Sequence, residues 1–211
     1  MLNGKLTIAN LGDSVATLVR KDSSWKKLNE EHIPDRPDER MRIESCNGTI
    51  FCNRIRGDLG VSRAFGNMEM KDLVIAEPEG QTWPLTSNDD LLVLASDGLY
   101  RSYPQEYVVK RILELRALGL SLGKVSETIL QECMSLTNTV KPCQDNLTLM
   151  IISLSNYLAC FERKIHASSL QLPAQCRVEK AMPGNSHWSK NVFADVSGIG
   201  NLSENNHSAY E

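Results

Sequence analysis

Short apolar runs separated by turn residues predict β-strands in the first half of the chain. Runs at 6–9 and 15–19 are divided by the Gly-Asp-Ser turn at 12–14, a pattern typical of two strands that meet at a tight turn. The continuous runs at 91–95 and 147–154 indicate strands that are covered on both faces. The chain is therefore expected to build at least one buried sheet.

Two amphipathic helices are predicted between these last two runs. Ser102 and Gln105 form an S-x-x-Q capping box with Pro104 in the first turn, and apolar residues then recur at helical spacing until Gly119 ends the helix. A second helix is expected from about 124 to 136, with its apolar side chains on one face. This order of elements indicates an α/β (α+β) fold with mixed or antiparallel sheets.

The segment 43–55 is predicted to be a β-hairpin. The dipeptide Asn47-Gly48 lies between two strand-like pieces, and Asn-Gly is the strongest short-range signal for a two-residue hairpin turn. With the turn at this position the thiols of Cys46 and Cys52 would not face each other.

Composition and charge narrow the class of protein. The 211 residues are 41% hydrophobic and 23% charged, as expected of a globular domain with an appendage. A net charge of −3 disfavours nucleic acid as a partner, because its binders carry a basic face. No stretch has the roughly 20 apolar residues of a membrane span, and residues 1–10 lack a signal-peptide core. Six cysteines without a C-x-x-C pair indicate reduced thiols in a cytoplasmic or nuclear protein.

The pattern of apolar residues ends after Ser155. Residues 157–211 are rich in Ser, Asn, Gly and His, with isolated aromatic residues and no sustained period. A segment of this composition cannot bury enough apolar surface to offset its conformational entropy. We therefore expect one domain at 1–156 followed by a largely disordered tail at 157–211.

Three aspartates stand where predicted strands end. Asp13 lies in the turn at 12–14, Asp97 follows the run at 91–95, and Asp145 precedes the last run. Carboxylates at the ends of neighbouring strands can converge on one cation, and oxygen ligands suit Mg²⁺ or Mn²⁺. Alternatively each aspartate only caps a turn, because Asp before Gly is common turn chemistry. Spacing alone leaves both interpretations open.

Six ordered motifs resemble the PPM-type (type 2C) metal-dependent serine/threonine protein phosphatase family. The resemblance covers residues 6–154, and the order of the six motifs is far more specific than any one of them. The resemblance is to the C-terminal part of the family's domain only. The motifs are 9–14 (ANLGDS), 31–34 (EHIP) with 39–43 (ERMRI), 54–66 (RIRGDLGVSRAFG), 76–78 (AEP), 94–99 (LASDGL) and 145–148 (DNLT).

The resemblance implies a fold, a reaction and a set of ligands. The family fold is a sandwich of two antiparallel sheets flanked by helices, whose N-terminal portion is not matched here. Its members hydrolyse phosphoserine and phosphothreonine in proteins with water activated by two or more Mg²⁺ or Mn²⁺ ions. Asp97 and Asp145 match ligands of the core metal pair, and Asp13 with Asp97 matches an additional ion. Gly98 and Asn146 match residues that support these ligands.

Two arginines and the partners also follow from the resemblance. Arg56 and Arg63 lie in the segment that leads to the flap beside the cleft. We favour structural salt bridges for both, and the alternative is that they face the substrate. The implied partners are phosphorylated proteins, with no nucleic acid and no membrane, and we expect a monomer.

Several departures from the family pattern favour a different role. Arg101 stands where the family usually has Asp, and its charge would repel a metal ion; Tyr100 replaces Trp, and Asn67 replaces another Asp. The sequence also lacks the family's Asp-Gly-His motif. Asp-Gly precedes none of its four histidines, which are His32, His166, His187 and His207. The alternative function is therefore a catalytically inactive pseudophosphatase that binds proteins. We predict that the isolated chain has no Mn²⁺-dependent phosphatase activity.

Overall fold

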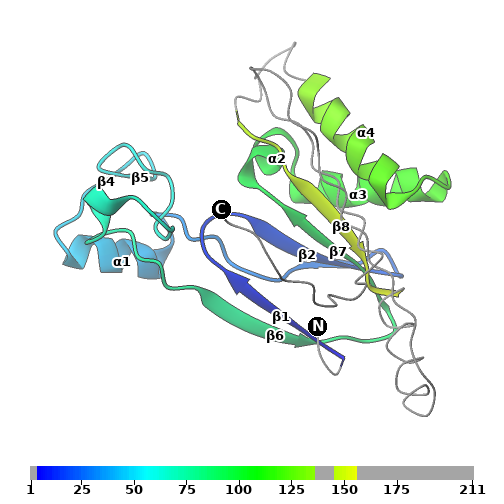
Figure 1. Ribbon diagram of the computed structural model, residues 1–211, viewed down its shortest axis with the longest axis horizontal. Helices are drawn as coiled ribbons and strands as arrows, with labels where there is room; N and C mark the ends of the chain where they lie inside the picture. The colour runs from blue at the N-terminus through cyan, green and yellow to red at the C-terminus, as the bar shows by residue number, and fades with distance from the viewer. Residues whose placement is uncertain (1–3, 136–144, 156–211) are drawn as a thin grey trace, which may run out of the picture.

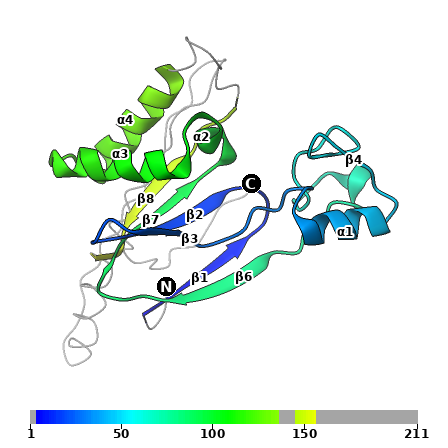
Figure 2. The same cartoon turned by 180° about the vertical axis from the view of Figure 1, so that it is seen from behind.

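The structure is a sandwich of two antiparallel β-sheets with helices over the outer face of the larger sheet (Figures 1 and 2). This computed structural model describes residues 4–135 and 145–155. The strands of the sandwich are β1 (Lys5–Asn10), β2 (Val15–Arg20), β3 (Trp25–Lys27), β6 (Glu79–Pro84), β7 (Asp89–Ala95) and β8 (Leu149–Ser153). The larger sheet has the order β3-β2-β7-β8, and the smaller sheet pairs β1 with β6.

The centre of the larger sheet is buried on both of its faces. Leu91, Val93 and Ala95 of β7 point toward the helices, whereas Leu92 points toward the smaller sheet, where it packs with Leu6 of β1. The prediction of a strand covered on both sides at 91–95 is confirmed. The antiparallel sandwich with flanking helices is confirmed with it.

Three helices follow β7 in the chain. They are α2 (Asp97–Ser102), α3 (Gln105–Ala117) and α4 (Leu122–Ser135). The predicted capping box is wrong, because Ser102 belongs to α2 and α3 has no side-chain cap. The side chain of Gln105 instead donates to the hydroxyl of Thr17 in β2. The second helix begins two residues earlier than predicted, and its expected end at Leu136 lies outside the described residues.

A small lobe is inserted between β3 and β6. It contains α1 (Pro37–Ser45), the hairpin strands β4 (Ile50–Phe51) and β5 (Arg54–Ile55), and the 3-10 helix η1 (Met68–Met70). Its own apolar core is formed by the buried residues Ile43, Ile55, Leu73 and Val74. Figure 1 shows the lobe at one side of the sandwich.

The lobe hairpin is not where the sequence placed it. Asn47-Gly48 ends α1 instead of joining two strands, and the hairpin turn is formed by Cys52 and Asn53, which both have positive φ. Asn47 does have the left-handed backbone that its dipeptide suggests, but this conformation serves helix ends as well as hairpins. Gly48 is required there, because a Cβ would lie 2.6 Å from the side chain of Ile43.

The predictions about a membrane span and about the C-terminal tail concern the whole chain, of which the structure describes only residues 4–135 and 145–155. Within 4–135 and 145–155, no helix is long and apolar enough to cross a membrane. The predicted tail at 157–211 lies outside the described residues.

Candidate functional site

Strand register brings the three aspartates to the same end of the larger sheet. Val15 pairs with Ala95, and Ala95 pairs with Leu149 on its other side. Asp13 stands two residues before Val15, and Asp97 stands two residues after Ala95. Asp145 lies in the segment just before β8, at the same end of the sheet. Three carboxylates from three neighbouring strands therefore lie around one end of the sandwich.

Arg101 bridges two of these carboxylates. It lies one turn after Asp97 in α2, and its Nη2 is 2.6 Å from Oδ2 of that residue. Its Nη1 donates to Oδ2 of Asp145, also at 2.6 Å. The arginine side chain is 59% exposed, whereas the two carboxylates are 25% and 38% exposed. One guanidinium thus neutralises acidic groups from two separate segments.

The carboxyl of Asp13 is half-buried, and its pKa responds to the charges of its neighbours. Burial raises the pKa of its carboxyl, and the nearby charge of Asp97 raises that pKa further. The guanidinium of Arg101 partly offsets both effects. The negative charges at this end are therefore close enough to oppose one another.

Gly98 and Asn146 hold the two acidic segments together. A Cβ on Gly98 would lie 2.4 Å from the carbonyl oxygen of Asn146, so only glycine allows this close approach. Ser96 reinforces the contact: its hydroxyl donates to the carbonyl of Asn146 at 3.2 Å and accepts from the backbone N–H of Thr148 at 3.0 Å. The backbone N–H of Asn146 also donates to Oδ1 of Asp145 at 2.8 Å.

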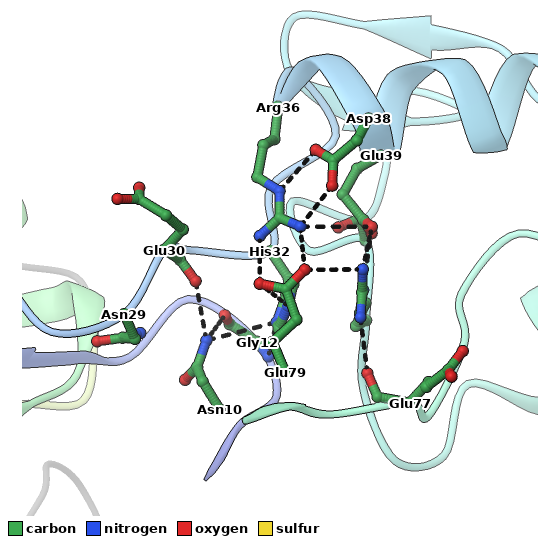
Figure 3. A network of polar contacts seen from close by, with 12 residues as sticks. Asn10, Gly12, Asn29, Glu30, His32, Arg36, Asp38, Glu39, Glu77 and Glu79 are labelled. Carbon is green, nitrogen blue, oxygen red and sulfur yellow. Dashed lines mark hydrogen bonds and ion pairs between the residues drawn. The ribbon is translucent and has the colours of Figure 1, made fainter. Parts of the chain in front are cut away.

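Asn10 and His32 fix the turn that carries Asp13, and sequence reasoning gave neither residue a role. The amide nitrogen of Asn10 donates to the carbonyls of Gly12 and Glu30, at 3.0 and 3.1 Å. The backbone N–H of Gly12 donates to Nδ1 of His32 at 3.1 Å (Figure 3). Asn10 belongs to the motif at 9–14 and His32 to the motif at 31–34. Membership of these motifs was the sequence signal that could have indicated their roles.

His32 is fully buried and neutral in this environment. Because a backbone N–H donates to its Nδ1, the ring proton lies on Nε2, which is 3.5 Å from the carboxylate of Glu79. Burial lowers the pKa of the imidazole, and the nearby guanidinium of Arg63 lowers it further. The ring therefore anchors the turn of Asp13 through Nδ1, whereas its buried Nε2 lies near Glu79 without a hydrogen-bond partner among the described residues.

Arg63 lies in that network and only 11% of its side chain is exposed. Its guanidinium contacts Oε1 of Glu39 at 2.7 Å and Oε1 of Glu79 at 3.1 Å, and it also donates to the carbonyl of Glu77 at 3.0 Å. These three partners are labelled in Figure 3. Since Glu79 begins β6 and Glu39 lies in α1, the arginine joins the lobe to the smaller sheet. The contacts of its side chain in this structure are structural salt bridges.

Glu39 is the buried centre of the same network. Its side chain is 2% exposed and also accepts from Arg42 at 2.8 Å. Burial alone would raise the pKa of its carboxyl, but hydrogen bonds from Arg63 and Arg42 outweigh burial and lower the pKa to about 2. This carboxylate is charged at every physiological pH.

Arg56 occupies a different environment from Arg63. It directly follows β5 in the lobe, is exposed, and has a left-handed backbone with φ 53°. Its backbone N–H donates to the carbonyl of Thr49 at 2.8 Å. The structure therefore gives Arg56 and Arg63 different surroundings: Arg63 lies in the buried network, and Arg56 lies on the surface of the lobe.

The described carboxylates do not by themselves form a metal site. Aspartate oxygens are chemically suited to Mg²⁺ or Mn²⁺, but within the described ranges no group of three or more His, Cys, Asp or Glu side chains could hold a metal ion. Asp97 and Asp145 direct carboxylate oxygens at the guanidinium of Arg101. A divalent ion that needs about six oxygen ligands is not accommodated by this arrangement.

Comparison with known sequences identifies relatives over most of the chain. Residues 1–141 match the family model described as protein phosphatase 2C. The chain is 30% identical over 198 residues to "Probable protein phosphatase 2C 58" of Oryza sativa subsp. japonica, covering 89% of this chain and 52% of that protein. It is 37% identical over 157 residues to "Probable protein phosphatase 2C 76" of Arabidopsis thaliana, covering 72% and 34%. The chain thus spans about half or less of the length of these relatives.

Solved structures share the same architecture. A phosphatase from Toxoplasma gondii superposes with a TM-score of 0.58 and 26% identity, over 70% of this chain and 52% of that chain. A Caenorhabditis elegans sex determining protein has a TM-score of 0.61 at 23% identity, over 71% and 36%. The second likeness concerns the fold alone.

Proposed function

Because this chain belongs to the protein phosphatase 2C family, we propose that it forms part of a domain that hydrolyses phosphoserine and phosphothreonine in proteins. The observation that supports this most is the gathering of Asp13, Asp97 and Asp145 at one end of the sandwich. The proposed partners are phosphorylated proteins of the cytoplasm or nucleus.

Hydrolysis of a phosphomonoester needs an oriented water and neutralisation of the phosphoryl oxygens. The carboxylates at this end can accept hydrogen bonds from a water and so orient it, while Asn10 and His32 keep the turn of Asp13 in place. Carboxylates cannot neutralise phosphate, so a cation is required. A need for Mg²⁺ or Mn²⁺ is part of the proposal and rests on the family alone, because the described donors do not form a metal site.

A second candidate function is a non-catalytic module that binds phosphorylated proteins. The bridge from Arg101 to Asp97 and Asp145 favours it, since these carboxylates already have a cationic partner. Binding of a phosphopeptide without release of phosphate is the property that separates this candidate from an enzyme.

The test is a phosphate-release assay on the longest protein product that contains these 211 residues. With a phosphothreonine peptide and Mn²⁺, we expect release of inorganic phosphate that falls at least about 100-fold in Asp97→Asn. Asp72→Asn, which changes an exposed aspartate in the lobe, serves as the matched control and should retain the rate. Peptide binding without any release by the unchanged protein would overturn the proposal in favour of the second candidate.

A further inference from the structure

Arg101 has the geometry of a cross-link rather than of an ordinary surface arginine. Its two terminal nitrogens each lie 2.6 Å from a different carboxylate. Those carboxylates belong to different elements, since Asp97 begins α2 and Asp145 lies in the segment before β8. In family members with a metal centre, the same two positions are expected to share a divalent ion.

The local fold sets up this cross-link. Because α2 begins at Asp97, the i,i+4 spacing puts Arg101 on the same face of the helix. The bare Cα of Gly98 lets the backbone of Asn146 approach α2. This approach brings Asp145 within reach of the second nitrogen of the guanidinium.

We propose that in this 211-residue chain Arg101 is a built-in cation that takes the place of a divalent metal ion between Asp97 and Asp145 and holds this end of the sandwich together without metal. A bridging ion would neutralise two acidic groups and fix their separation. A guanidinium does both, because its donors form a rigid fork that matches carboxylate oxygens.

The proposal predicts competition between the arginine and a metal ion. An ion that reached Asp97 and Asp145 would have to displace the guanidinium, which would remain nearby on its short helix. Repulsion between a single and a double positive charge at contact distance weakens binding by at least about tenfold, even at the dielectric constant of water. The unchanged chain should therefore have low affinity for metal at these residues, and removal of the arginine should raise it.

The experiment measures Mn²⁺ binding to the full 211-residue chain by electron paramagnetic resonance of the free ion. Arg101→Ala should bind Mn²⁺ at least about tenfold more tightly than the unchanged chain, and the gain should disappear when Asp97→Asn is added. Arg40→Ala is the matched control, because Arg40 also bridges two partly exposed carboxylates, those of Asp35 and Glu44 in the lobe. This control should bind like the unchanged chain.

Two results would overturn the proposal. One is Arg101→Ala that binds Mn²⁺ no more tightly than Arg40→Ala. The other is that the unchanged chain binds Mn²⁺ saturably and as tightly as Arg101→Ala does, and that this binding is lost in Asp97→Asn.

Folding provides a second readout. Circular dichroism should show that EDTA leaves the melting temperature of the unchanged chain unaltered. If Arg101→Ala and the longer Arg101→Gln both fail to fold, Mn²⁺ should restore their folding, and failure to do so would also overturn the proposal. None of these readouts depends on phosphate release, so a failure of the proposed phosphatase function would leave them unaffected.

Discussion

The charge of the buried Glu39 is expected to be the main electrostatic support of the lobe. Its carboxylate accepts hydrogen bonds from Arg42 and Arg63, and these place its pKa at about 2 instead of the ordinary 4.5. A depression of this size corresponds to about 3 kcal/mol of stability at neutral pH. Glu39→Gln keeps the shape of the side chain and removes the charge, so it should lower the free energy of unfolding by about that amount.

The pH dependence follows from the sign of this shift. Because the pKa of Glu39 is lower in the folded state than in the unfolded state, its contribution is complete above about pH 4.5 and is lost as the pH falls toward 2. The difference between the unchanged chain and Glu39→Gln should therefore be largest at pH 7 and should shrink below pH 4.5.

Urea unfolding followed by circular dichroism at pH 7 and pH 3 measures this difference. Hydrogen exchange of the α1 amides shows whether the lobe opens separately. Glu44→Gln is the matched control, since Glu44 is an exposed glutamate on the same helix that pairs with Arg40; it should change the stability by less than about 1 kcal/mol. An equally small loss in Glu39→Gln at pH 7, or a large loss that is the same at both pH values, would refute the reasoning.

Three further predictions concern the site and the residues around it. The isolated chain should release no phosphate with Mn²⁺, and robust turnover that is lost in Asp97→Asn would contradict this. Gly98→Ala should lower stability by about 1–3 kcal/mol in thermal unfolding because its Cβ would collide with the backbone of Asn146. Gly123→Ala should be neutral or stabilising, because apart from the local backbone of α4 and the two chain neighbours no atom lies within 4 Å of the added Cβ. Since burial lowers the pKa of His32, stability should fall as the pH drops below the unfolded value near 6.5. His32→Gln should be less stable at pH 7.5 and should show a flatter pH profile, and an unchanged profile would argue against the buried neutral imidazole.

The strands and their acidic ends could be predicted because their signals are local. The apolar run at 91–95 is continuous, so its burial on both faces follows from the sequence alone. Asp13 and Asp97 flank such runs, and antiparallel pairing of Val15 with Ala95 then places them at one end. That pairing joins segments far apart in the sequence, so the meeting of these aspartates was indicated by the family resemblance and not by the local pattern.

The lobe and its network could not be predicted in the same way. Helix α1 is mainly polar, and Ile43 is its one buried apolar residue, so its apolar pattern is too weak to indicate a helix. The roles of Glu39 and His32 depend on partners about 20 or more residues away in the sequence. The positive charge of Arg101 was visible in the sequence, but its bridge to Asp145 depends on a contact across 44 residues.

A crystal structure of the full chain grown with Mn²⁺ tests the central claim most directly, because anomalous scattering locates the ion. We predict the guanidinium of Arg101 between Asp97 and Asp145, with no Mn²⁺ bound to either carboxylate. A Mn²⁺ ion coordinated by both carboxylates, with the arginine turned away, would contradict the account.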